Sequence, residues 1–167
     1  MRDNYALVGF MGCGKTTVGR ELAKRLQCPF WDLDAAIAQG ERRTIPEIFA
    51  QQGEAGFREL EHAYLKQAAG RRGVLSCGGG LALFPRNREV LSRHFTTVFL
   101  DCDFETCYQR IRASSRPLVQ DKSEAEVRAL FESRYPIYQA CCDLQVNAAH
   151  SPVLVVQEIL KQRRRHR

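Results

Sequence analysis

The sequence lacks the features that define several classes of protein. No C-x-x-C pair is present, and the four histidines fall at no spacing typical of metal ligands. No apolar run approaches the roughly 20 residues of a membrane-spanning helix. No leader-like segment precedes the first apolar run, and no repeat or low-complexity linker divides the chain. We therefore expect a cytoplasmic protein with no membrane partner, folded as one domain over residues 1–167.

An excess of charge of one sign is also missing from the body of the chain. The net charge is +6, but five basic residues lie within the last seven positions: Lys161, Arg163, Arg164, Arg165 and Arg167. Without these five, 20 basic residues remain against 19 acidic ones. A basic tail over residues 161–167 is typical of a solvated helix end, where the helix dipole favours cations. The charge pattern therefore predicts no nucleic-acid partner.

The most informative motif lies near the start of the chain. Residues 9–16 read G-F-M-G-C-G-K-T and match the phosphate-loop pattern G-x-x-x-x-G-K-[ST] at every required position. An apolar run precedes the motif and a helical pattern follows it, which is the context of a true phosphate loop. In such loops the backbone N–H groups and the helix N-terminus cradle phosphate. We predict that a nucleoside triphosphate is bound by Gly12, Cys13, Gly14, Lys15, Thr16 and Thr17, with Lys15 on the β- and γ-phosphates and the Thr16 hydroxyl on Mg²⁺.

The seven cysteines are an odd number, and we expect most of them to be small, buried and reduced. Cys13 is the exception, because it lies in the phosphate loop near a helix N-terminus, which lowers the pKa of an exposed thiol. We expect Cys13 to be open to oxidation or alkylation and to have no catalytic role.

Apolar strand-like runs alternate with helical patterns along the whole chain. We predict strands at residues 6–8, 30–33, 74–76, 97–100 and 144–147, and helices at residues 15–26, 45–52, 54–69, 85–92, 104–112, 124–140 and 152–163. This alternation predicts an α/β fold of three layers, α/β/α, around a five-stranded parallel sheet. Loops that follow parallel strands meet at the carboxyl edge of the sheet, so functional residues should gather there. The polar segment from about residue 112 to 123 shows no periodicity and is interpreted as a mobile lid or, alternatively, an inert surface loop.

Two aspartates follow the second predicted strand in Asp32-Leu33-Asp34. Asp32 is placed to hold Mg²⁺ through water opposite Thr16. Asp34 is placed to accept a proton from a substrate hydroxyl or to orient that hydroxyl. Either aspartate has an alternative role as the N-cap of a helix that starts near Ala35.

Three arginines and a glycine run are the remaining candidates. Arg58 is either a solvated helix residue paired with glutamates at helical spacing or a ligand of an anion. Arg116, in the predicted lid, is suited to neutralise charge in a phosphoryl transition state, and Arg134 to bind a carboxylate through two hydrogen bonds. The glycine run at residues 78–80 indicates either a substrate close to the backbone or a tight turn.

Taken in order, these motifs resemble the shikimate kinase family over nearly the whole chain. The matching stretches are L-V-G-F-M-G-C-G-K-T-T-V-G-R, F-W-D-L-D-A-A-I, G-E-A-G-F-R-E-L-E, V-L-S-C-G-G-G, S-R-P-L and E-S-R-Y-P-I-Y. The resemblance implies a phosphate-loop kinase fold and transfer of the ATP γ-phosphate to the 3-hydroxyl of shikimate, with Mg²⁺. The family usually has threonine where this chain has Cys77.

The resemblance also implies roles for individual residues. Asp34 would contact the shikimate hydroxyls and act as base or orienting group, and Arg58 and Arg134 would clamp the shikimate carboxylate. The backbone of Gly79 and Gly80 would meet the substrate. Lys15, Thr16 and Asp32 keep their phosphate and metal roles, and Arg116 would reach the phosphates when the lid closes. Arg110 would pack on adenine, with Arg112 as the competing residue.

Two other functions remain open at this stage. One is a related kinase that acts on gluconate or a nucleotide, although a nucleotide has no carboxylate for the two arginines to bind. The other is a non-catalytic relative that only binds nucleotide. We expect a monomer.

Overall fold

The computed structural model describes residues 2–113 and 121–165. Its elements in chain order are β1 (Tyr5–Val8), α1 (Lys15–Leu26), β2 (Phe30–Asp32), α2 (Leu33–Glu41), α3 (Ile45–Ala69), β3 (Val74–Ser76), the 3-10 helix η1 (Leu81–Leu83), α4 (Pro85–His94), β4 (Thr96–Asp101), α5 (Phe104–Arg112), α7 (Glu124–Cys141), β5 (Leu144–Asn147) and α8 (Pro152–Arg165). Of these, the sequence interpretation lacked η1 and gave α2 only a possible start near Ala35. Arg116 and most of the predicted lid lie outside the described residues.

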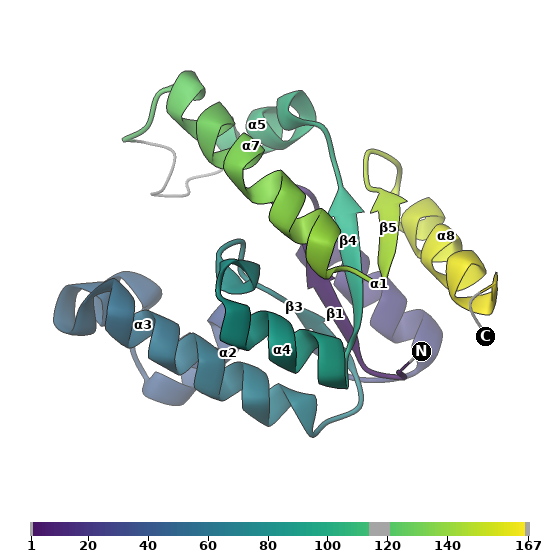
Figure 1. Cartoon of the computed structure of the whole chain (residues 1–167), viewed down its shortest axis with the longest axis horizontal. Helices are drawn as coiled ribbons and strands as arrows, with labels where there is room; N and C mark the ends of the chain where they lie inside the picture. The colour runs from purple at the N-terminus through teal and green to yellow at the C-terminus, as the bar shows by residue number, and fades with distance from the viewer. Residues whose placement is uncertain (1, 114–120, 166–167) are drawn as a thin grey trace.

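The five strands form one parallel sheet in the order β2-β3-β1-β4-β5, which confirms the predicted α/β fold. Strand β1 is central: Leu7 pairs with Ser76 of β3 on one side and with Val98 of β4 on the other. Helices α1 and α8 pack together behind the sheet, and α4 and α7 cover its front face (Figure 1). All four residues of β1 are buried, because helices cover both faces of a parallel sheet. The loops that follow β1 and β3 and the start of α2 after β2 therefore share one edge of the sheet.

Helix α3 carries a break where the sequence predicted two separate helices. Gly53 has φ 69° and ψ −176°, so the helical hydrogen bonding is interrupted there by a residue without a side chain. The helix begins with a capping box in which Thr44 Oγ1 accepts from Glu47 N and Glu47 Oε2 accepts from Thr44 N. The break at Gly53 divides α3 into two halves, and the second half carries Arg58.

The basic tail is only partly solvated, which corrects the expectation from the charge pattern. Helix α8 runs to Arg165. The Arg163 guanidinium forms an ion pair with Asp3 and lies 5.5 Å from the centre of the Tyr5 ring. The Arg163 side chain is only 15% exposed, because it packs on the start of the central strand. No helix within residues 2–113 and 121–165 has both the length and the apolar character needed to cross a membrane.

Candidate active site

A cavity of about 820 Å³ opens at the carboxyl edge of the sheet. Its walls come from the loop after β1, the start of α2, both halves of α3, the glycine run after β3, and helices α5 and α7. Among the residues that the sequence singled out, it is lined by Gly12, Gly14, Lys15, Thr16, Thr17, Asp32, Asp34, Arg58, Gly79, Gly80, Arg110 and Arg134. The fold therefore brings these residues to one place, although they are spread over more than 120 positions of the chain.

The phosphate loop has the shape that its glycines allow. Gly12 and Gly14 have φ values of 78° and 94°, which residues other than glycine rarely adopt. A Cβ on Gly12 would lie 2.7 Å from the carbonyl oxygen of Cys107, so α5 packs directly on the loop backbone. Lys15 Nζ donates to the carbonyl oxygens of Gly9 at 2.7 Å and Phe10 at 3.0 Å, which holds the ammonium group over the loop. The loop thus presents a cation and backbone N–H groups to the cavity.

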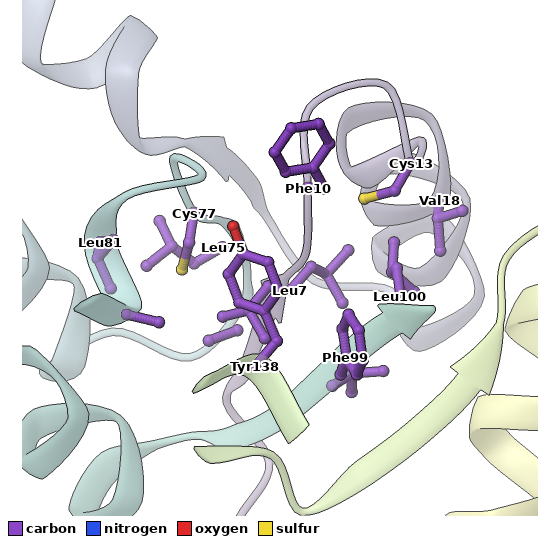
Figure 2. Close-up of a cluster of buried hydrophobic side chains, with 14 of the residues drawn as sticks. Leu7, Phe10, Cys13, Val18, Leu75, Cys77, Leu81, Phe99, Leu100 and Tyr138 are labelled. Carbon is purple, nitrogen blue, oxygen red and sulfur yellow. The ribbon is translucent and has the colours of Figure 1, made fainter. Parts of the chain in front are cut away.

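Cys13 is buried, and the prediction of an exposed, easily oxidised thiol there is wrong. Its side chain is 1% exposed and turns into the core, where it lies among other buried side chains (Figure 2). Burial raises the pKa of the Cys13 thiol, and the nearby Lys15 ammonium offsets this only in part. The loop contributes to the cavity through its backbone at this position, while the sulfur anchors the loop to the core.

Asp32 is the N-cap of α2 and also contacts Thr16, while its role toward Mg²⁺ stays a prediction. Its Oδ1 accepts from Ala35 N at 3.0 Å and so caps α2. Its Oδ2 accepts from the Thr16 hydroxyl at 3.3 Å. Asp34 lies in the first turn of α2, and a Cβ on Gly78 would lie 3.1 Å from Asp34 Oδ1. The bend from strand to helix thus separates the two carboxylates: Asp32 faces the phosphate loop, and Asp34 faces the glycine run.

Arg58 is held in place by an ion pair with a buried carboxylate. Its Nη1 lies 2.9 Å from Glu61 Oε1, and its Nη2 lies 3.6 Å from Glu54 Oε1, which confirms both pairings suggested by helical spacing. The Arg58 side chain is 15% exposed and lies 5.3 Å and 5.2 Å from the ring centres of Phe57 and Phe84. The alternative of a solvated Arg58 is therefore wrong.

Glu61 is a site residue that the sequence interpretation missed. It is only 1% exposed, and this burial raises the pKa of its carboxyl group, while Arg58 lowers it. Asp34 and Arg134 also act on the Glu61 charge, so the carboxylate lies near both arginines and the aspartate. Its spacing in F-R-x-x-E was a visible signal, but spacing alone does not distinguish a buried partner from a solvated one.

The glycine run gives the two arginines room. A Cβ on Gly80 would lie 2.7 Å from Arg58 Nη2, and a Cβ on Gly79 would lie 3.2 Å from Arg134 Nη1. The same run also forms a turn, because Leu81 N donates to the carbonyl oxygen of Gly78 as η1 begins. The turn is confirmed, and the approach of a substrate to this backbone stays a prediction. Two guanidinium groups from α3 and α7 meet over a stretch of backbone that has no side chains.

Other side chains complete the walls. Arg110 Nη1 donates to Gly12 O at 3.0 Å, whereas Arg112 lies 5.7 Å from the ring centre of Tyr108, so Arg110 is the arginine against the phosphate loop. Phe49 and Phe57 pack with ring centres 4.7 Å apart and form an apolar wall that the sequence interpretation did not include. Cys77 is buried, and burial raises the pKa of its thiol, so it stays a neutral, weak hydrogen-bond group at neutral pH.

The oxygen atoms of Asp32 and Thr16 suit a hard cation that keeps most of its water ligands. No cluster of three or more histidine, cysteine, aspartate or glutamate side chains able to hold a metal occurs among the described residues.

Comparisons with known proteins find relatives that match nearly the whole chain. The shikimate kinase family model matches residues 11–164. The shikimate kinase of Enterococcus faecalis is 38% identical over 164 residues, which are 96% of this chain and 98% of that protein. The structure of a shikimate kinase from Acinetobacter baumannii in complex with shikimate has a TM-score of 0.92 and 36% identity, and the match covers 100% of this chain and 96% of that one. A deoxyadenosine kinase from M. mycoides, at 15% identity and a TM-score of 0.65 over 95% of this chain and 97% of that one, shares the fold alone.

Proposed function

The chain belongs to the shikimate kinase family, and we propose that its site transfers the γ-phosphoryl group of ATP to the 3-hydroxyl of shikimate. The observation that carries the proposal is the meeting of Arg58 and Arg134 over Gly79 and Gly80, next to a complete phosphate loop. A planar guanidinium binds a carboxylate through two parallel hydrogen bonds, and shikimate carries a single carboxylate on a small ring. A nucleotide acceptor would leave both arginines without that partner.

The phosphate end of the site rests on the loop after β1. Lys15 and the backbone N–H groups from Gly12 to Thr17 would hold the β- and γ-phosphates, with the Cys13 backbone among them. Arg110 would pack on adenine from its place on α5. Thr16 would bind Mg²⁺ directly and Asp32 through water, and the ion would neutralise charge on the phosphates. Phosphoryl transfer needs little covalent help from the protein, so these groups act by position and charge.

The acceptor end of the site rests on Asp34, which would orient the shikimate hydroxyl and accept its proton during transfer. Asp34 lies beside the glycine run, on the same side as the arginine pair, so one small substrate can reach all three side chains. Glu61 would hold the Arg58 guanidinium in the orientation that the carboxylate needs. Phe49 and Phe57 would cover the apolar face of the ring.

Water must be kept from the γ-phosphate during transfer, which would give a lid at about residues 112–123 its purpose. Within it, Arg116 would reach the phosphates on closure; this role, like a monomeric state and a cytoplasmic location, stays a prediction.

The test is ADP release from ATP and Mg²⁺ with shikimate, gluconate or a nucleoside monophosphate as acceptor. We expect release that depends on shikimate, with a shikimate phosphate as product whose position of attachment is read by phosphorus–proton coupling. Release with another acceptor alone would contradict the carboxylate clamp, and ATP binding without release would indicate a non-catalytic relative. The Asp34→Asn variant should lose turnover while still binding ATP. Unchanged turnover in that variant would contradict the role of Asp34.

A further inference from the structure

Two cysteines flank the N-cap of α5, outside the substrate cavity. Cys102 precedes Asp103, the N-cap of α5, and Cys107 is the fourth residue of the helix. In the hydrophobic staple, side chains at these two positions pack together across the first turn. Here the staple is made of two thiols: Cys107 Sγ donates to the carbonyl oxygen of Cys102 at 3.9 Å, and both side chains are buried.

A second cavity gives a route to this pair from solvent. It has a volume of about 470 Å³, and Cys102 forms part of its wall together with Phe104, Phe131 and Tyr135. Its rim includes the exposed residues Asp103 and Asn147, so the cavity opens at the surface. Cys102 keeps 3% of its surface exposed and lines this cavity, whereas Cys107 is fully buried and does not, so Cys102 is the cysteine that a small neutral oxidant can reach.

The two thiols differ in acidity. When the Cys107 S–H turns from the carbonyl oxygen to the sulfur of Cys102, that hydrogen bond lowers the pKa of Cys102 and raises that of Cys107. The charge of Arg110 lowers the pKa of Cys102 further, while burial, Asp103 and Asp101 oppose this effect. Because the thiolate is the nucleophile, Cys102 is the member of the pair suited to attack an oxidant.

We propose that Cys102 and Cys107 form a thiol oxidation site, at which a hydroperoxide that enters through the second cavity converts the pair into a disulfide. The Cys102 thiolate attacks one peroxide oxygen, the O–O bond breaks, and Cys102 becomes a sulfenic acid as the first water or alcohol leaves. The Cys107 thiol then attacks the Cys102 sulfur, the S–O bond breaks, and a second water leaves. In sum, two thiols and one hydroperoxide give one disulfide, one water and the reduced oxidant, with two electrons passing from the sulfurs to the peroxide.

The disulfide acts on the phosphate loop through α5. A disulfide has no S–H, so its formation removes the hydrogen bond from Cys107 Sγ to the carbonyl oxygen of Cys102 and changes the contacts within the first turn of α5. The carbonyl oxygen of Cys107 lies against Gly12, and Arg110, one turn further along, donates to Gly12 O. Oxidation therefore weakens ATP binding. We expect about a tenfold loss of ATP affinity, the scale of one hydrogen bond to a charged group.

The experiment treats the whole protein with hydrogen peroxide, removes the excess with catalase and blocks the remaining thiols by alkylation. A protease that cuts after Glu105 separates Cys102 from Cys107, so a disulfide between them joins two otherwise separate peptides in the mass spectrum. ATP affinity is measured by calorimetry without shikimate, because the effect on ATP rests on the proposed phosphate site but not on the identity of the acceptor. A dithiol reductant should restore both the separate peptides and the affinity.

Two variants and a control complete the design. In Cys102→Ser and Cys107→Ser, peroxide should leave ATP affinity unchanged, whereas Cys142→Ser, which lacks a partly exposed cysteine at the end of α7, should respond like the wild type. If either serine variant fails to fold, the peptide map of the wild-type protein decides whether the disulfide forms. A map in which peroxide oxidises other cysteines, or joins Cys102 to Cys13, while Cys107 stays reduced would overturn the proposal. Linked peptides with unchanged ATP affinity would overturn the coupling to the phosphate loop.

Discussion

Replacement of Gly80 by alanine tests the arginine clamp directly, because the added methyl group would meet the Arg58 guanidinium. The new Cβ would lie 2.7 Å from Nη2 and 2.9 Å from Nη1 of Arg58. Ordinary van der Waals contact needs about 3.4 Å or more, so the guanidinium has to move by about 0.7 Å. The backbone itself tolerates alanine, since Gly80 has φ −93° and ψ −8°. The fold should therefore survive, and the strain should fall on Arg58.

The magnitude follows from the contacts that hold Arg58. A shift of this size stretches the 2.9 Å ion pair with Glu61 beyond hydrogen-bonding distance and misplaces the group that would bind the shikimate carboxylate. Loss of one charge-assisted hydrogen bond costs about 1.5 to 2 kcal/mol, which corresponds to a rise in the KM for shikimate of roughly 10- to 30-fold. The KM for ATP should change by less than about twofold, because the phosphate loop is not touched.

The assay measures initial rates with shikimate varied at saturating ATP, and with ATP varied at saturating shikimate. Gly70→Ala is the matched control: it lies at the C-terminus of α3, and the nearest atom to its added Cβ is 3.8 Å away. In an Arg58→Ala background, the Gly80 substitution should add little, because its target is gone. An unchanged KM for shikimate in Gly80→Ala, or an equal rise in both KM values, would refute the reasoning.

Three further predictions concern the second arginine, the buried acid and a helix cap. Arg134→Lys should raise the KM for shikimate about tenfold and leave the KM for ATP nearly unchanged, because a point charge does not replace the planar fork; equal effects in a rate assay would contradict this. Burial raises the pKa of Glu61 in the folded protein, so the folded protein binds the carboxyl proton more tightly than the unfolded chain does. The contribution of this protonation to the free energy of unfolding is therefore present at low pH and is lost as pH rises. Melting temperatures should therefore show wild type losing stability relative to Glu61→Gln as pH rises from about 4.5 to 7; a relative gain would mean that the pKa is lowered instead. Thr44→Ala should lower the free energy of unfolding by about 1 kcal/mol in a urea titration through loss of the capping box, with both KM values unchanged; an altered KM would show that the cap also positions the site.

Local features were the easiest to predict from the sequence. The phosphate loop is set by spacing within eight residues, and its strand–loop–helix context is equally local. The capping boxes at Thr44 and Ser123 are equally local features, because cap and partner lie three residues apart. Alternation of strands and helices was sufficient for the parallel sheet, since parallel strands need helical crossovers.

The errors and omissions concern burial, which depends on distant parts of the chain. Cys13 looked reactive from its place at a helix N-terminus, but the core side chains around it decide its pKa. Glu61 looked like any helical glutamate three residues from an arginine until α3 was packed against the glycine run. Asp32 caps α2 and also accepts a hydrogen bond from the Thr16 hydroxyl. This arrangement depends on the bend between β2 and α2. Local spacing contains none of this information.

The ion pair of Arg163 with Asp3 also has a topological consequence. It joins two residues 160 positions apart, so the two described ends of the chain meet beside the central strand. A short linker would close the chain into a ring without disturbing the sheet, and new ends could then be cut elsewhere. The exposed turn at residues 70–72, between α3 and β3, is one such place, because its residues lie outside the cavity walls. In such a rearranged chain the strands would be synthesised in a new order, while their order in the sheet would stay the same.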